Sequence, residues 1–241
     1  MESALPPLTP STLYLVATPI GNLEDITLRA LRTLKECDVI AAEDTRRTGI
    51  LLKHFGISKP MLSYFQFNEA KRSEEIIERL RRGEKIALVT DAGSPGISDP
   101  GERVAKAAIA AGFRVEPVPG PSALVAAVTA SGLPTEEFHF IGFLPHKSGQ
   151  RRKKLESLAG IEGTLVLYES PYRIEKLLGE LKDIFPERPV VLGRELTKKF
   201  EEFLRGNPAE LIEQLRNRSI KGEFVVLIGE GKGASEKHSC A

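Results

Sequence analysis

Residues 43–47, Glu-Asp-Thr-Arg-Arg, place two carboxylates beside two guanidinium groups directly after an apolar run. A carboxylate in this setting can act as a general base, and the arginines can anchor phosphate groups. We therefore take Glu43, Asp44 and Arg46 as candidate catalytic residues and Arg47 as a candidate phosphate contact. The alternative is an ordinary helix start, in which Asp44 is the N-cap and the arginines form weak surface ion pairs.

The segment 89–101, "VTDAGSPGISDPG", follows an apolar run and is rich in Gly and Pro. Glycines after a buried strand let main-chain groups approach a ligand closely. A Walker loop would end in Gly-Lys-Ser/Thr, which the sequence lacks, and the glycine spacing fits a dinucleotide fingerprint poorly. Two interpretations remain. One is a main-chain shelf for an uncharged or cationic ligand such as S-adenosylmethionine, and the other is a long turn with an N-cap at Ser98 or Asp99 before Pro100.

Two more loops share this character, namely 17–27, "ATPIGNLEDIT", and 117–124, "PVPGPSAL". Each follows a predicted strand and precedes a predicted helix. Three such loops at strand exits should fall on one edge of a parallel sheet. Together they predict a ligand site at that edge.

Short apolar runs alternate with amphipathic stretches along the whole chain, which predicts α/β sheets covered on both faces. Strands are expected at 12–18, 38–43, 60–65, 85–91, 114–119, 138–143, 163–170, 189–193 and 222–230. Helices are expected at 28–36, 47–56, 68–83, 101–112, 122–132, 149–160, 172–185 and 208–218. The segment 198–206 suits a helix nearly as well as a strand.

We predict an α/β fold of two domains, 12–122 and 123–230, with a ligand cleft between them. The ends, 1–11 and 231–241, have the composition of disordered termini.

The composition excludes several classes of protein. A formal charge of +1 over 241 residues argues against a protein that coats nucleic acid indiscriminately. The two cysteines, Cys37 and Cys240, give no disulfide framework, and no His/Cys spacing suggests a metal site. We expect no signal peptide and no membrane span, and therefore a cytoplasmic protein.

One short segment, 145–154, is strongly basic on this otherwise balanced chain. A local cluster of cations of this kind suits RNA phosphates. We expect it to bind RNA through Lys147, Arg151, Arg152, Lys153 and Lys154. The run at 79–85 is expected to be a solvated helix face.

Seven motifs in this order carry a resemblance to a known family: "LVATPIGNLEDIT", "AAEDTRRTGILLKHFGI", "VTDAGSPGISDPG", "VPGPSAL", "GFLPHK", "YESPYR" and "GRELTKKFEE". Over residues 12 to about 229 the chain closely resembles the ribosomal RNA small subunit methyltransferase I family of the tetrapyrrole-methylase superfamily. The resemblance implies a homodimer that binds S-adenosylmethionine between two α/β domains. It also implies 2′-O-methylation of a decoding-centre cytidine of 16S rRNA in the small ribosomal subunit.

The resemblance also implies roles for individual residues. By match to the cofactor loops, the cofactor-binding residues are Pro19, Asp91, Gly93, Ser94, Ile97, Ser122 and Ala123, with looser matches at Tyr168 and Glu223. Lys198, in the "GRELTKKFEE" motif, is a further catalytic candidate, and an ion-paired turn is the alternative there. The tetrapyrrole enzymes carry Gly-Asp-Pro where this chain has Gly93-Ser94-Pro95, and this difference favours the RNA branch.

Two other functions stay open on the sequence. A tetrapyrrole or other small-molecule methyltransferase could use the same scaffold, although the basic segment and the absence of Trp argue against it. A catalytically silent RNA-binding protein of ribosome assembly is the second. Cofactor titration separates the silent protein from both enzymes.

Overall fold

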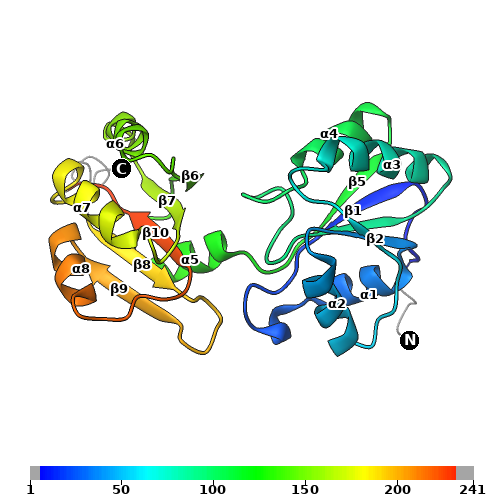
Figure 1. The fold of residues 1–241 in the computed structure, drawn as a ribbon, viewed down its shortest axis with the longest axis horizontal. Coiled ribbons are helices and arrows are strands. Elements are labelled where there is room, and N and C mark those ends of the chain that lie inside the picture. Colours follow the sequence, from blue (N-terminus) through cyan, green and yellow to red (C-terminus); the bar gives the residue numbers. More distant parts are fainter. Residues whose placement is uncertain (1–5, 232–241) are drawn as a thin grey trace, which may run out of the picture. The chain divides into compact units, whose positions relative to one another are not determined.

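The computed structural model describes residues 6–231, which form two compact units, the first up to Ser122 and the second from Ala123 on. Each unit is a five-stranded sheet with helices packed on it (Figure 1). Each expected strand and helix is present, with boundaries shifted by a few residues.

The sheet of the first unit is entirely parallel. Its order is β3 (Met61–Ser63), β2 (Val39–Ala42), β4 (Ile86–Val89), β1 (Thr12–Val16), β5 (Arg114–Val118). Because parallel strands end at the same edge, the segments that follow β4, β1 and β5 start at three neighbouring positions of one edge. The expectation that the three Gly/Pro loops share one edge of a parallel sheet is confirmed.

Helices cover both faces of this sheet (Figure 1). One face packs against α3 (Glu69–Arg81) and α4 (Glu102–Ala110), and the other against α1 (Leu28–Glu36) and α2 (Thr45–His54). Successive strand residues point to opposite faces, so both sets must be apolar. Leu13 belongs to the α3/α4 core and Tyr14 to the α1/α2 core. This explains the continuous apolar runs of the strands.

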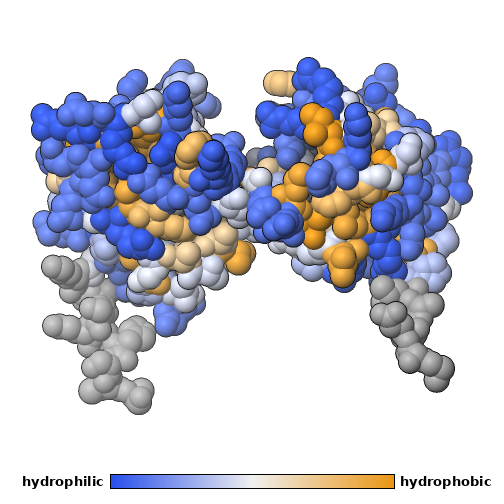
Figure 2. Space-filling view, turned by 90° about the horizontal axis from the view of Figure 1, so that it is seen from below, coloured by the Kyte–Doolittle hydropathy of each residue, from blue (hydrophilic) through white to orange (hydrophobic). Residues whose placement is uncertain are grey.

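The face that carries α1 and α2 also has apolar residues on its surface, as Figure 2 shows. Leu28 of α1 and Ile50 of α2 are both exposed.

No helix within residues 6–231 is long and apolar enough to cross a membrane.

The first residues of α1 and α4 mark where the loops after β1 and β4 end. Thr27 caps α1, and a short 3₁₀ helix, η1 (Leu23–Asp25), precedes it. The N-cap at Ser98 or Asp99, one of the two alternatives considered for this loop, is not present, because α4 begins only at Glu102 after Gly101. The backbone φ is 61° at Ser98 and 147° at Gly101, so the chain turns away from helical geometry between them.

The sheet of the second unit is mixed. Its order is β6 (Phe138–Phe143), β7 (Thr164–Glu169), β10 (Phe224–Ile228), β8 (Val190–Arg194), β9 (Glu202–Gly206). Only β6 and β7 run parallel, and the other neighbours are antiparallel. The ambiguous segment 198–206 is a turn followed by the edge strand β9, which pairs with β8 as a hairpin.

Three helices of the second unit lie on one face of its sheet, namely α6 (Ser148–Ser157), α7 (Ile174–Ile184) and α8 (Pro208–Leu215). They share a core with alternate residues of the central strands, such as Leu165, Leu192 and Val226. Helix α5 (Ala123–Ser131) packs against β10 and β8 and lies apart from these three helices (Figure 1).

The expected disorder of the N-terminal segment does not extend to residues 6–11. The Leu8 N–H donates to Glu36, the Thr9 N–H donates to the Tyr14 hydroxyl at 2.7 Å, and Arg32 donates to the Pro6 carbonyl. Leu8 also packs against the α1/α2 core. The remaining ends, residues 1–5 and 232–241, lie outside the described residues.

We predict that Gly101→Ala lowers the free energy of unfolding by about 2 kcal/mol, because φ is 147° and the new Cβ would lie 3.0 Å from the Gly96 nitrogen. Urea unfolding measures the change. Gly160→Ala is the matched control, since its Cβ would meet nothing within 4 Å. Equal losses in the two variants would contradict the assigned strain.

Candidate functional site

Three loops meet at Gly93. The Thr18 N–H donates to the Gly93 carbonyl at 2.9 Å, and the Gly93 N–H donates back to the Thr18 carbonyl at 3.0 Å. A Cβ on Gly93, which has φ 82°, would lie 3.5 Å from Ile20 and 3.8 Å from the Pro121 carbonyl. The loops after β1, β4 and β5 are therefore in contact, at a residue where the left-handed backbone favours glycine.

A second close approach joins the first and third loops. A Cβ on Gly120 would lie 3.1 Å from the Ala17 Cβ. The Thr18 hydroxyl also donates to the Thr90 carbonyl at the end of β4. The edge of the sheet is thus built mainly from main chain, with Pro19 buried and Ser94 and Ser122 partly exposed beside it.

Two carboxylates lie at the same edge, one after β2 and one after β4. The Asp91 N–H donates to Glu43 at 3.3 Å, and the Asp44 N–H donates to Asp91 at 3.2 Å. Arg47 adds an ion pair with Asp91 at 3.2 Å. The two strand ends are therefore cross-linked, and the Glu43 and Asp91 carboxylates have fixed positions.

Burial raises the pKa of Glu43, and the nearby Asp91 charge adds to this, although the Asp91 N–H and Arg47 oppose it. The pKa of Asp44 is lowered by its hydrogen bonds with the Arg46 side chain and backbone. Asp44 accepts from the Arg46 N–H as the N-cap of α2, so the structural role considered for Asp44 is present. Of the two acids, Glu43 is the better proton acceptor because its conjugate acid is weaker.

These residues fit S-adenosylmethionine. The N–H and carbonyl of Gly93 bond Thr18, so we expect the adenosine and the amino acid to be held by other main-chain groups of these loops. An exposed apolar side chain, Ile97, lies on the same loop as Gly93. A sulfonium cation is favoured by fixed carboxylates such as Glu43 and Asp91. Within residues 6–231, no group of three or more His, Cys, Asp or Glu side chains is arranged to hold a metal ion.

The remaining cofactor candidates, Ala123, Tyr168 and Glu223, belong to the second unit. Ala123 is the first residue of α5, and the Tyr168 ring lies between Phe140 and Phe143. That they complete the site around Gly93, in a cleft between two domains, stays a prediction.

Lys198 is held by two carboxylates of the second unit. Its ammonium donates to Glu195 at 3.0 Å and to Glu223 at 2.8 Å. Burial disfavours the charge, but these bonds outweigh it and raise the pKa of Lys198. Lys198 therefore stays protonated and can act as a cation but not as a base. The ion-paired turn considered from the sequence is present.

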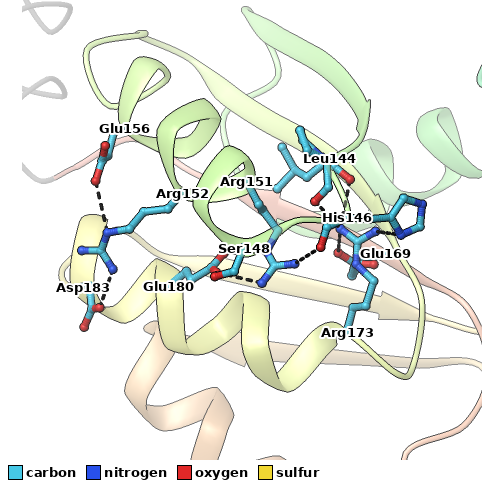
Figure 3. A network of polar contacts seen from close by, with 11 residues as sticks. Leu144, His146, Ser148, Arg151, Arg152, Glu156, Glu169, Arg173, Glu180 and Asp183 are labelled. Atoms are coloured by element: carbon cyan, nitrogen blue, oxygen red, sulfur yellow. Dashed lines mark hydrogen bonds and ion pairs between the residues drawn. The ribbon is translucent and has the colours of Figure 1, made fainter.

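The basic segment divides into one buried and several exposed cations. Arg151 is 3% exposed and donates twice to Glu180, at 2.6 and 2.8 Å (Figure 3). The expectation that Arg151 is a surface cation is wrong, because it lies on the buried side of α6. Arg152 is exposed but bonds Glu156 and Asp183, while Lys147, Lys153 and Lys154 are exposed.

The sequence did not reveal which side chains hold the start of the basic segment in place. Arg173, at the start of α7, donates to the Leu144 and Pro145 carbonyls at 3.0 and 3.2 Å and pairs with buried Glu169 (Figure 3). Arg151 donates to the His146 carbonyl from α6. The "YESPYR" motif contains both Glu169 and Arg173, whereas nothing in the sequence marks Glu180 as a partner.

The sequence matches a known protein family and named relatives. The sequence profile described as Tetrapyrrole (Corrin/Porphyrin) Methylases matches residues 12–212. A protein of Halalkalibacterium halodurans named "Ribosomal RNA small subunit methyltransferase I" is 52% identical over 222 residues, which are 92% of this chain and 76% of that protein. A protein of the same name from Xylella fastidiosa is 50% identical and covers 95% and 84% of the two chains.

Solved structures share the fold. Uroporphyrin-III-C-methyltransferase from Thermus thermophilus gives a TM-score of 0.65 at 24% identity, over 91% of this chain and 94% of that one. A cobalt precorrin-4 methyltransferase gives 0.66 at 21% identity, over 91% and 95%. Another structure of the first enzyme, with a TM-score of 0.63 at 22% identity over 91% and 97%, is complexed with S-adenosyl homocysteine.

We predict that Arg151→Ala costs about 3 kcal/mol of stability, because it leaves the Glu180 carboxylate without its buried partner. Arg152→Ala, at the next residue and on the exposed side of α6, should change stability little. Thermal unfolding compares the two. If both lose the same amount, Arg151 has no structural role of its own.

We predict that Glu43→Gln raises the free energy of unfolding at pH 7. The raised pKa of Glu43 means that the folded state disfavours its charged form, so wild-type stability falls as pH rises through that pKa. Below the ordinary Glu pKa both residues are neutral and the difference should vanish. Urea unfolding at pH 3.5 and pH 7 checks the sign, and a variant that is less stable only at pH 7 would contradict it.

Proposed function

We propose, because the chain belongs to the ribosomal RNA small subunit methyltransferase I family within the tetrapyrrole methylases, that it transfers a methyl group from S-adenosylmethionine to small-subunit ribosomal RNA. The observation that carries the proposal is the meeting of three strand-end loops at Gly93 beside two fixed carboxylates. This arrangement offers main-chain groups for the donor and a proton acceptor for the substrate.

The acceptor in this proposal is the 2′-hydroxyl of a decoding-centre cytidine in 16S rRNA. When bound, the cofactor supplies an activated methyl group, and transfer needs the acceptor oxygen in line with it. A ribose hydroxyl is a poor nucleophile. Glu43, whose pKa is raised, accepts its proton, and the Lys198 ammonium supplies positive charge. Arg46 and Arg47, both exposed at the start of α2, are available to RNA phosphates.

The same proposal covers partners and location. The protein acts as a homodimer on the small ribosomal subunit in the cytoplasm. Its RNA contacts are Arg47 and the exposed cations of the basic segment, Lys147, Arg152, Lys153 and Lys154. Arg151 is buried and paired with Glu180, so in this proposal it holds the segment in place and makes no contact with RNA.

Methyl transfer is tested with small ribosomal subunits from a strain that lacks the gene. Incubation with the protein and S-adenosylmethionine should add one 2′-O-methylcytidine to 16S rRNA, detected by nucleoside mass spectrometry. Glu43→Gln should lower kcat about 10²-fold if Glu43 accepts the proton, while its hydrogen bond from Asp91 survives. No new methylated nucleoside with the wild-type protein overturns the proposed function, and donor binding without transfer to RNA favours a small-molecule acceptor.

We predict that Lys153→Ala with Lys154→Ala weakens RNA binding and flattens its salt dependence by about 1.5 in the slope of log K against log salt. Both side chains are exposed on α6. Fluorescence anisotropy with a 16S rRNA fragment at several salt concentrations measures this. The charge-matched control is Arg81→Ala with Arg82→Ala, in the other basic run. Equal slopes for the two double variants would rule out a role of α6 in RNA binding.

A further inference from the structure

A β-bulge in β6 places the Phe143 ring on the face of the sheet opposite to the one it would have in a regular strand. The pairing of β6 with β7 shifts between Phe140 and Gly142, and Gly142 has φ 71°. Phe140 is therefore opposite Val166, and Phe143 is opposite Tyr168, two residues further along β7. Since residues two apart share a face, the bulge brings both phenylalanines onto one face with Tyr168.

The three rings form a connected group. Tyr168 meets Phe140 with centroids 5.0 Å apart and Phe143 with centroids 5.6 Å apart, both edge to face. Contacts of this geometry are favourable and hold the rings in fixed orientations. Phe143 is nevertheless 58% exposed. A large apolar ring is thus held in place and left open to a partner.

The helices of the second unit do not cover Phe143. Leu165 and Leu167 alternate with Val166 and Tyr168, and they pack into the core under α6, α7 and α8. The rings therefore lie on the opposite face. Helix α5 packs against β10 and β8, away from β6. The part of the face formed by β6 and the end of β7 is open to solvent at Phe143.

Two cations, Arg173 and Lys147, lie near the carboxyl end of β6. Since β6 and β7 are parallel, their carboxyl ends share one edge, and Arg173 bonds the carbonyls of Leu144 and Pro145 directly after Phe143. The arginine also contacts the His146 ring (Figure 3). Lys147 follows, exposed, and Tyr172, 91% exposed, lies on the loop after β7. Open aromatic rings beside cations fit an unpaired nucleotide, with its base on a ring and its phosphate on a cation.

We propose that Phe143 stacks against an unpaired base of the RNA substrate and that Lys147 contacts the adjoining phosphate. The proposal rests on the proposed function in that the substrate is RNA. It adds a substrate class, which is single-stranded or looped RNA, and a residue that selects for it. Hydrogen bonds from Arg151 and Arg173 hold the backbone carbonyls of Leu144 and His146, which lie between Phe143 and Lys147 in the chain.

The test compares single-stranded and duplex forms of one fluorescein-labelled 12-mer RNA, whose affinities are measured by anisotropy at low salt. Wild type should bind the single strand more tightly. Phe143→Ala should weaken single-strand binding by at least 5-fold and leave duplex binding unchanged, because paired bases cannot stack on the ring. Phe143→Trp should retain single-strand binding, and Phe143→Leu, which keeps apolar area without an aromatic face, should behave as Ala.

Several results would overturn the proposal. These are equal weakening of both RNA forms by Phe143→Ala, wild-type affinity of Phe143→Leu, or no binding of the single strand by wild type. A change of oligomeric state on ultracentrifugation would assign the ring to a second copy, and a loss confined to S-adenosylmethionine affinity would assign it to the donor. Because the ring is largely exposed, the variants should stay folded, with a Tm close to that of the wild type. The binding assay needs no methyl transfer, so failure of the proposed function is seen separately.

Discussion

Two hydrogen bonds exchanged between Thr18 and Gly93 hold the site together. They join the chain after β1 to the chain after β4, and the loop after β5 lies against the same glycine. A side chain at position 93 would be strained at φ 82° and would point at its neighbours. The left-handed backbone at this point explains why residue 93 is a glycine.

The charged Glu43 carboxylate beside this junction lowers the stability of the folded state, as groups in functional sites commonly do. Glu43 and Asp91 accept from backbone groups of each other's loops and lie close enough for their charges to oppose. A raised pKa makes Glu43 a better proton acceptor while it weakens the folded state at neutral pH. The second unit shows the opposite arrangement, since Lys198 is kept charged by two acids.

The sequence allowed the parallel sheet and its loop-lined edge to be predicted, because strand exits of a parallel sheet share an edge whatever the strand order. It did not allow the link between Glu43 and Asp91 to be predicted, since that link depends on β2 lying beside β4. Arg151 was misplaced because charge was considered without helical phase. It precedes buried Leu155 by four residues and buried Leu158 by seven, which puts it on the inward side of α6. The mixed sheet of the second unit, with β10 between β7 and β8, also had no signal in the alternation of strands and helices.

A crystal structure of the full chain with S-adenosylhomocysteine tests the central claim most directly. The account predicts ligand density in contact with main-chain atoms of residues 18–20, 91–97 and 119–122, with the junction at Gly93 unchanged. An ordered ligand that touches none of these three loops would contradict it.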